Sequence, residues 1–116
     1  MALKHLGPSK KAAFVSLMVE VINADGRVDV NELLKINDIT EREHIDSATF
    51  ALGRNFDVEL ALATLSQCSS AVKTEIATWL IAIAEADGMV QAAERAVLHM
   101  MFDRMGILSL PDDNNG

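Results

Sequence analysis

The sequence predicts one all-α domain of about six to seven helices. Apolar residues, mainly Ala, Leu, Val, Ile and Met, recur at the i, i+3, i+4, i+7 spacing of a helix face, and aromatic residues make up only 4% of the 116 residues. The two prolines, Pro8 and Pro111, lie near the ends, so no proline breaks a helix between them. A short motif also occurs twice, which indicates duplicated helix-turn-helix units.

The first predicted helix spans residues 10–23, and Pro8 with Ser9 marks its start. Only a narrow polar edge interrupts its apolar residues, so we expect it to be mostly buried. Its main apolar stripe consists of Phe14, Leu17, Met18 and Val21. Gly26 ends this helix, because glycine readily adopts the left-handed conformation found at helix C-termini.

The second predicted helix begins near Asp29, because Asp29 and Glu32 have the spacing of a capping box. The pattern weakens around Asn37. Thr40 and Glu43 form another capping-box pattern, which predicts a kink or a separate short helix there.

Two short helices are predicted over residues 47–55 and 58–66, the second capped by Asp57. A long apolar helix follows over residues 70–86, and the last helix spans residues 91–105. These two helices end at glycines, Gly88 and Gly106.

We expect residues 1–9 to form a leader, residues 10–107 the helical domain and residues 108–116 a flexible tail. The leader and the residues after it contain a basic cluster that we expect to be solvated: Lys4, His5, Lys10 and Lys11.

Charge and composition exclude several functional classes. The net charge of −7 disfavours nucleic acids and anionic membrane surfaces. No apolar run is long enough to span a bilayer, and the first residues lack a signal-peptide pattern. The single cysteine, Cys68, cannot form an internal disulfide, which fits a reducing compartment. We therefore expect a cytoplasmic protein.

The repeated motif is Ala-Asp-Gly-x-Val-x-x-x-Glu, at residues 24–32 and again 62 residues later, at 86–94. Its spacing is similar to the second half of an EF-hand calcium loop. The first ligand position of such a loop would fall on Val21 or Ile83, whose aliphatic side chains cannot bind calcium. An EF-hand is therefore excluded, and we predict instead two halves related by a pseudo-twofold axis.

Two interpretations of the repeated acids stay open. In the first, Asp25 and Asp87 accept hydrogen bonds from free N–H groups of the following helix, while Val28 and Val90 anchor each turn to the core. In the second, the symmetry axis brings four carboxylates together, and a divalent cation, calcium or magnesium, relieves their repulsion. The four candidate metal ligands are Asp25, Glu32, Asp87 and Glu94.

No catalytic constellation is recognisable. Cys68 is far in sequence from His44 and His99, and the histidines lack zinc-ligand spacing. The last helix is apolar nearly all round and rich in methionine. If its outer side is exposed, it would offer a surface for a protein partner or a homodimer.

The two Asp-Gly turns and the alternation of short and long helices between them resemble the TerB-like tellurite-resistance domain, over about residues 10–107. The resemblance implies an all-α domain of roughly seven helices. It also implies a non-enzymatic role in stress response, linked to tellurite and other toxic oxyanions through protein assemblies near the membrane. Acidic residues of such domains have been proposed to bind metal. The chain departs from the family pattern at Gln91, where an acidic or hydroxyl residue is expected.

The expected function is thus a binding or scaffold module of this stress-resistance type, with a protein partner and the divalent-cation site described above. Two alternatives remain. One is a purely structural interaction domain whose acids only cap helices, and the other is a metal-dependent enzyme.

Overall fold

The structure, a computed structural model, describes residues 2–24 and 26–107. Within these residues it contains α-helices, one short 3₁₀ helix and no strand, which confirms the all-α prediction. The predicted tail lies outside the described residues. In chain order the elements are η1 Ala2–His5, α1 Pro8–Ile22, α2 Val30–Arg42, α3 Ser47–Arg54, α4 Val58–Leu65, α5 Ser70–Ala84 and α6 Ala92–Met105.

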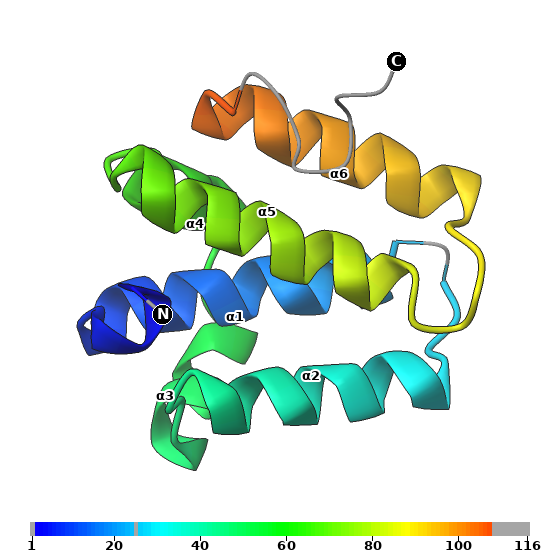
Figure 1. Cartoon of the computed structure of the whole chain (residues 1–116), viewed down its shortest axis with the longest axis horizontal. Coiled ribbons are helices and arrows are strands. Elements are labelled where there is room, and N and C mark those ends of the chain that lie inside the picture. The colour runs from blue at the N-terminus through cyan, green and yellow to red at the C-terminus, as the bar shows by residue number, and fades with distance from the viewer. Residues whose placement is uncertain (1, 25, 108–116) are drawn as a thin grey trace.

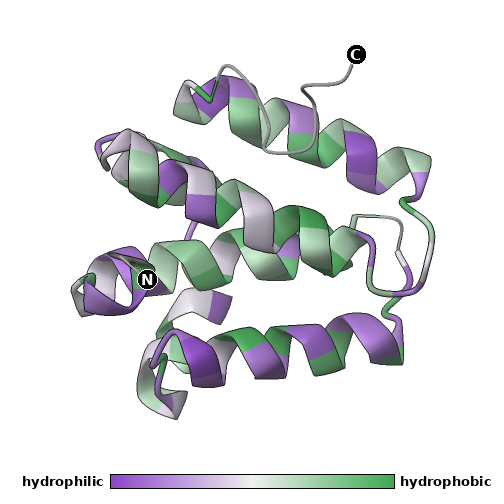
Figure 2. Cartoon of the chain, in the orientation of Figure 1, coloured by the Kyte–Doolittle hydropathy of each residue, from purple (hydrophilic) through white to green (hydrophobic). Residues whose placement is uncertain are grey.

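Helices α1 and α5 lie side by side at the centre of the molecule and run in the same direction (Figure 1). Hydrophobic residues dominate the second half of each helix, toward the ends that lead to α2 and α6 (Figure 2). The largest side chains that they bury completely are Phe14, Leu17, Met18, Ile76, Leu80 and Ile83. The hydrophobic core therefore forms around these two helices, as their apolar stripes predict.

Helices α2 and α6 flank this central pair on opposite sides, and each runs back against the helix that precedes it (Figure 1). The bounds of the helices repeat along the chain. The first residue of α5, Ser70, lies 62 residues after the first residue of α1, Pro8, and the last residues, Ala84 and Ile22, have the same offset. The first residues of α2 and α6, Val30 and Ala92, are also 62 residues apart.

Helices α3 and α4 cover α1. The close approach of α3 depends on Gly53, because a Cβ atom at that position would lie 2.6 Å from the Ala12 carbonyl oxygen. The Ser16 hydroxyl donates a hydrogen bond of 3.0 Å to the carbonyl of Phe56, which ties α1 to the turn between α3 and α4.

The sequence-based expectations for α2 are wrong in one respect. The helix continues without a break to Arg42, and the Thr40 hydroxyl donates to the Asn37 carbonyl of the same helix. The helix then ends with His44 in the left-handed conformation, at φ 58°. The N–H of Ile45 donates to the carbonyl of Thr40 at 2.9 Å, which closes a Schellman-type turn. The second capping-box pattern therefore does not start a helix.

The expectation of a solvated leader is also wrong in part. Leu3 in η1 is fully buried, and its N–H donates to the Glu75 carboxylate of α5 at 3.1 Å. The ammonium group of Lys11 donates to the carbonyl of His44 at 2.8 Å. Residues before α1 thus pack against the domain. No helix in the described part of the chain has the length and apolarity needed to cross a membrane.

Candidate functional site

Both repeated turns lie at the same end of the molecule, where α1 joins α2 and α5 joins α6 (Figure 1). Helices α1 and α5 both end earlier than predicted, at Ile22 and Ala84, and Gly26 and Gly88 lie in the turns that follow them. The N–H of Gly26 donates to the carbonyl of Asn23 at 3.1 Å, and that of Gly88 donates to Glu85 at 2.9 Å. Both glycines are left-handed, with φ 76° and 93°. Both turns therefore require glycine, because other residues rarely adopt this backbone conformation. The glycines shape the turns and do not terminate the helices.

The turns deliver the chain to two helix starts. The side chain of Asp29 caps α2 by accepting from the N–H of Asn31 at 2.7 Å. At the start of α6, the Glu94 carboxylate accepts from the N–H of Gln91 at 3.0 Å. Glu32 and Glu94 each occupy the third position of their helix, so their side chains project back over the turns.

The carboxyl groups of Glu32 and Glu94 are in hydrogen-bonding contact, and both residues are buried, with 2% and 1% of their surface exposed. Burial, together with the hydrogen bond and charge of Glu94, raises the pKa of Glu32 from 4.5 to about 8. A hydrogen bond that the Glu32 carboxylate accepts from the backbone N–H of Asp29 opposes this increase in pKa. At neutral pH Glu32 therefore holds a proton in the contact with Glu94.

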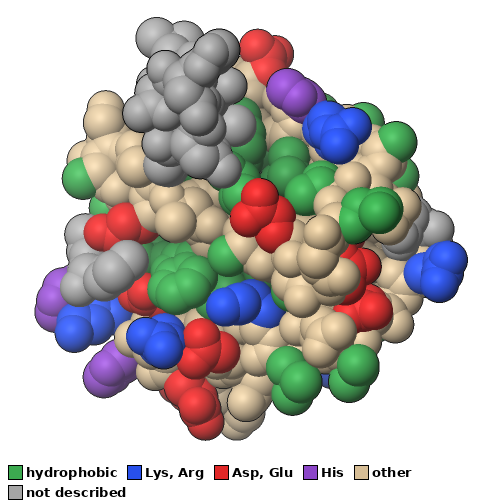
Figure 3. Space-filling model, turned by 45° about the vertical axis from the view of Figure 1, so that its right-hand side comes forward, with side chains coloured by type: hydrophobic (Ala, Val, Ile, Leu, Met, Phe, Trp, Pro, Cys, Tyr) green, Lys and Arg blue, Asp and Glu red, His purple; other side chains and the backbone are tan. Residues whose placement is uncertain are grey.

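A small pocket of about 100 Å³ opens beside Glu32. It is lined by Arg27, Val28, Asp29, Glu32, Asp87 and Gln91. Acidic and basic side chains are interspersed on this side of the molecule (Figure 3). The oxygen atoms of Asp29, Glu32, Asp87 and Gln91 are of the type that calcium and magnesium prefer.

The structure thus brings Glu32 and Glu94 together, with Asp87 close enough to raise the pKa of Glu32 through its charge. Asp87 is exposed, and its carboxylate accepts from the N–H of Met89 at 3.2 Å. The prediction that Asp87 caps the following helix is wrong, because Met89 precedes α6 and the capping position is Gln91. Asp25 lies outside the described residues.

The fit to a cation is therefore partial. Among the described residues, no three His, Cys, Asp or Glu side chains are arranged as a ready-made ligand set. Two buried carboxyl groups already face each other, and Asp87 would have to turn toward them to contribute a third ligand. Arg27, which also lines the pocket, adds a positive charge that a bound cation would meet.

Two further expectations are corrected by burial. Val28 is 53% exposed and does not anchor its turn to the core, whereas Val90 is half-buried and packs against the core. The outer side of α6 is not apolar. Of its methionines, Met101 and Met105 are buried and Met100 is half-buried against the core, and its exposed residues are Ala92, Arg95, Ala96, His99, Asp103 and Arg104. The last helix therefore does not present the apolar partner surface expected from its composition.

A third buried acid, Glu43, was not predicted from the sequence. This residue is 1% exposed, and its Oε2 atom accepts from the indole N–H of Trp79 at 2.9 Å. Its other oxygen, Oε1, is buried without a hydrogen-bond partner. The two residues are 36 positions apart in the chain, and a contact of this kind leaves no local spacing pattern.

A profile of the family described as "Tellurite resistance protein TerB" matches residues 11–110 of the chain. No curated protein and no solved structure matches the chain.

Proposed function

Because the chain belongs to the TerB tellurite-resistance family, we propose that it is a non-enzymatic binding module that holds a divalent cation, calcium or magnesium, between Glu32 and Glu94. One observation carries this proposal: two carboxyl groups from separate helix starts meet in a buried place. Buried ionised carboxylates repel each other unless a proton or a cation lies between them. A divalent cation can replace the proton and bind both groups.

In this proposal each residue has a definite part. Glu32 and Glu94 supply the two buried carboxylates, and the hydrogen bond from Gln91 to Glu94 fixes the orientation of the second. Asp87, and by the repeat of the motif Asp25, would supply outer ligands from the turns. The bound cation supplies charge neutralisation, which joins the start of α2 to the start of α6.

We also infer that α1–α2 and α5–α6 are two copies of one unit, related by a pseudo-twofold axis. Support comes from their matching helix bounds and from the same backbone hydrogen bond in both turns. The cation would then lie between equivalent residues of the two copies, at the place where a symmetric pair of ligands meets.

A purely structural role for these acids is the second candidate, and one observation favours it. Glu94 already accepts the N–H of Gln91, as a capping residue does. A metal-dependent enzyme has less support, because a pocket of about 100 Å³ leaves little room for a substrate beside a cation.

Thermal unfolding at pH 8.5, with and without millimolar calcium, magnesium or manganese, distinguishes the first two. A site at a hundredfold excess over its dissociation constant stabilises the fold by about 2.7 kcal/mol. We expect Glu32→Gln to abolish this stabilisation. Glu41→Gln is the matched control, because Glu41 lies exposed on the same helix and should leave the response intact. If none of the ions raises the unfolding temperature of the unmodified protein, the acids are only caps.

A further inference from the structure

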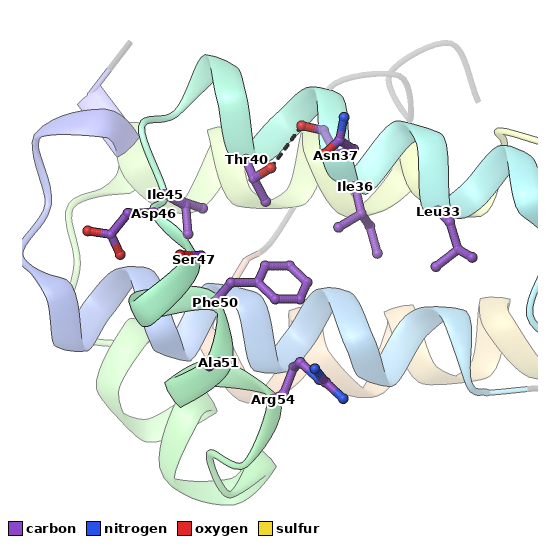
Figure 4. A pocket seen from close by; sticks show the side chains of 10 residues that line it. All are labelled: Leu33, Ile36, Asn37, Thr40, Ile45, Asp46, Ser47, Phe50, Ala51 and Arg54. Carbon is purple, nitrogen blue, oxygen red and sulfur yellow. Dashed lines mark hydrogen bonds between the residues drawn. The ribbon is translucent and has the colours of Figure 1, made fainter.

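A groove of about 500 Å³ lies between α2 and α3, away from the carboxyl pair (Figure 4). Its two walls have the same construction. Leu33, Ile36, Asn37 and Thr40 line it from α2, and Ser47, Phe50, Ala51 and Arg54 line it from α3. Each set follows the i, i+3, i+4, i+7 spacing, so each wall is one helix stripe about two turns, or about 10 Å, long.

The middle of this groove is apolar. The side chains of Ile36 and Phe50 approach one another across it, and Leu33 projects into it near the open end (Figure 4). Leu33 remains 46% exposed, and the neighbouring Val30 and Leu34 on α2 are 64% and 62% exposed. Hydrophobic side chains also gather at the edge of the molecule formed by α2 (Figure 3). Such a continuous apolar strip on one helix is typical of a binding surface.

The two ends of the groove carry opposite charges. Arg54 lies across from Leu33 at the open end, and it makes no ion pair with any residue that the structure describes. Asp46 lies at the closed end, beside the turn that joins the two helices. Its carboxylate accepts from the N–H of Thr49 at 2.8 Å, and this bond lowers the pKa of Asp46, which keeps it ionised.

We propose that the α2–α3 groove binds about two turns of an amphipathic helix from a partner protein, with the C-terminal end of that helix at Arg54 and its N-terminal end at Asp46. The two stripes diverge from the turn between α2 and α3 and leave room for a third helix, whose apolar anchors cover Leu33, Ile36 and Phe50 (Figure 4). The direction follows from charge. The negative end of the helix dipole and an acidic residue face Arg54, so the Arg54 end of the groove sets the direction of the bound helix.

Two stapled 15-residue helical peptides with the same leucine stripe test this proposal. One carries Lys in its first turn and Glu in its last turn, and the other has these charges exchanged. Binding to the full ¹⁵N-labelled chain is followed by NMR. We expect the first peptide to bind about fivefold more tightly, the worth of one exposed ion pair. The amide shifts should map to residues 33–40 and 47–54.

The variants use exposed positions, so that folding is not at stake. Arg54→Glu should remove or invert the preference between the peptides, and Leu33→Lys should abolish binding of both. Leu60→Lys is the matched control, because Leu60 is 56% exposed on α4, outside the groove. Equal binding of the two peptides, shifts on another face, or no binding at all would overturn the proposal. So would a dimer in sedimentation that Leu33→Lys dissociates, because the occupant would then be a second copy.

Discussion

The helix pairs α1–α2 and α5–α6 have the same register, yet their second helices are buried to different degrees. At matching positions, α2 and its C-cap bury Glu32, Ile36, Ile39 and Glu43, and α6 buries Glu94, Leu98, Met101 and Met105. Helix α6 buries a further large residue, Phe102, where α2 has the half-buried Thr40. Helix α2 is also the more hydrophilic in the banding of Figure 2.

In the first helix pair, buried acids replace part of the apolar contact that holds the second pair to the core. Helix α2 contacts the core through two aliphatic side chains with a buried acid at each end, and its remaining apolar residues face solvent. Helix α6 is held mainly by apolar burial. We therefore expect the attachment of α2 to depend on proton and cation binding, and that of α6 to depend on packing.

The largest expected effect is on pH dependence. Unfolded Glu32 loses its proton near pH 4.5, whereas folded Glu32 keeps it until about pH 8. The folded state therefore binds more protons in this window, and the free energy of unfolding falls as pH rises through it, by about 5 kcal/mol at roughly 1.4 kcal/mol per pKa unit. Glu32→Gln should remove this contribution, as urea unfolding at several pH values would measure. An unchanged slope in that variant would contradict the buried pair.

The next effect concerns the matching positions Glu43 and Met105. Met105→Glu places a carboxylate at a site 1% exposed with no indole to receive it, so we expect a loss of about 3 kcal/mol. Glu43→Met should stay within about 1 kcal/mol, because added apolar burial offsets the unpaired N–H of Trp79. Urea unfolding at pH 7 measures both. Equal tolerance at the two positions would mean that the two helices are attached in the same way.

The smallest effect separates the two turns. Val90→Thr should cost about 1 kcal/mol, because Val90 packs against the core, and Val28→Thr should change stability by less than about 0.5 kcal/mol. Thermal unfolding of the two variants side by side measures the difference. A larger loss at Val28 would indicate that this side chain is covered in solution.

Much of this architecture follows from local pattern. The apolar stripes of α1 and α5 predict that both helices are buried. The repeated motif leaves two interpretations open, helix capping and a meeting of four carboxylates, and of those four the structure brings Glu32 and Glu94 into contact. The continuous course of α2 through Asn37 was not predictable, because apolar contacts from Ile36 and Ile39 outweigh a locally weak pattern.

Other features depend on contacts between distant parts of the chain. The bond from Trp79 to Glu43 and the need for Gly53 against Ala12 arise only when helices pack. The α2–α3 groove likewise depends on the angle between two helices, which no spacing in the sequence specifies.

The exchange of a proton for a cation is most directly tested by counting protons. Calorimetric titration of the protein with calcium at pH 7, in two buffers of different ionisation enthalpy, gives the number released per bound ion. Because Glu32 holds its proton until about pH 8, we predict a release of about one proton, lost in Glu32→Gln and kept in Glu41→Gln. Binding without proton release, or no binding at any pH up to about 9, would contradict a cation site at the Glu32–Glu94 pair.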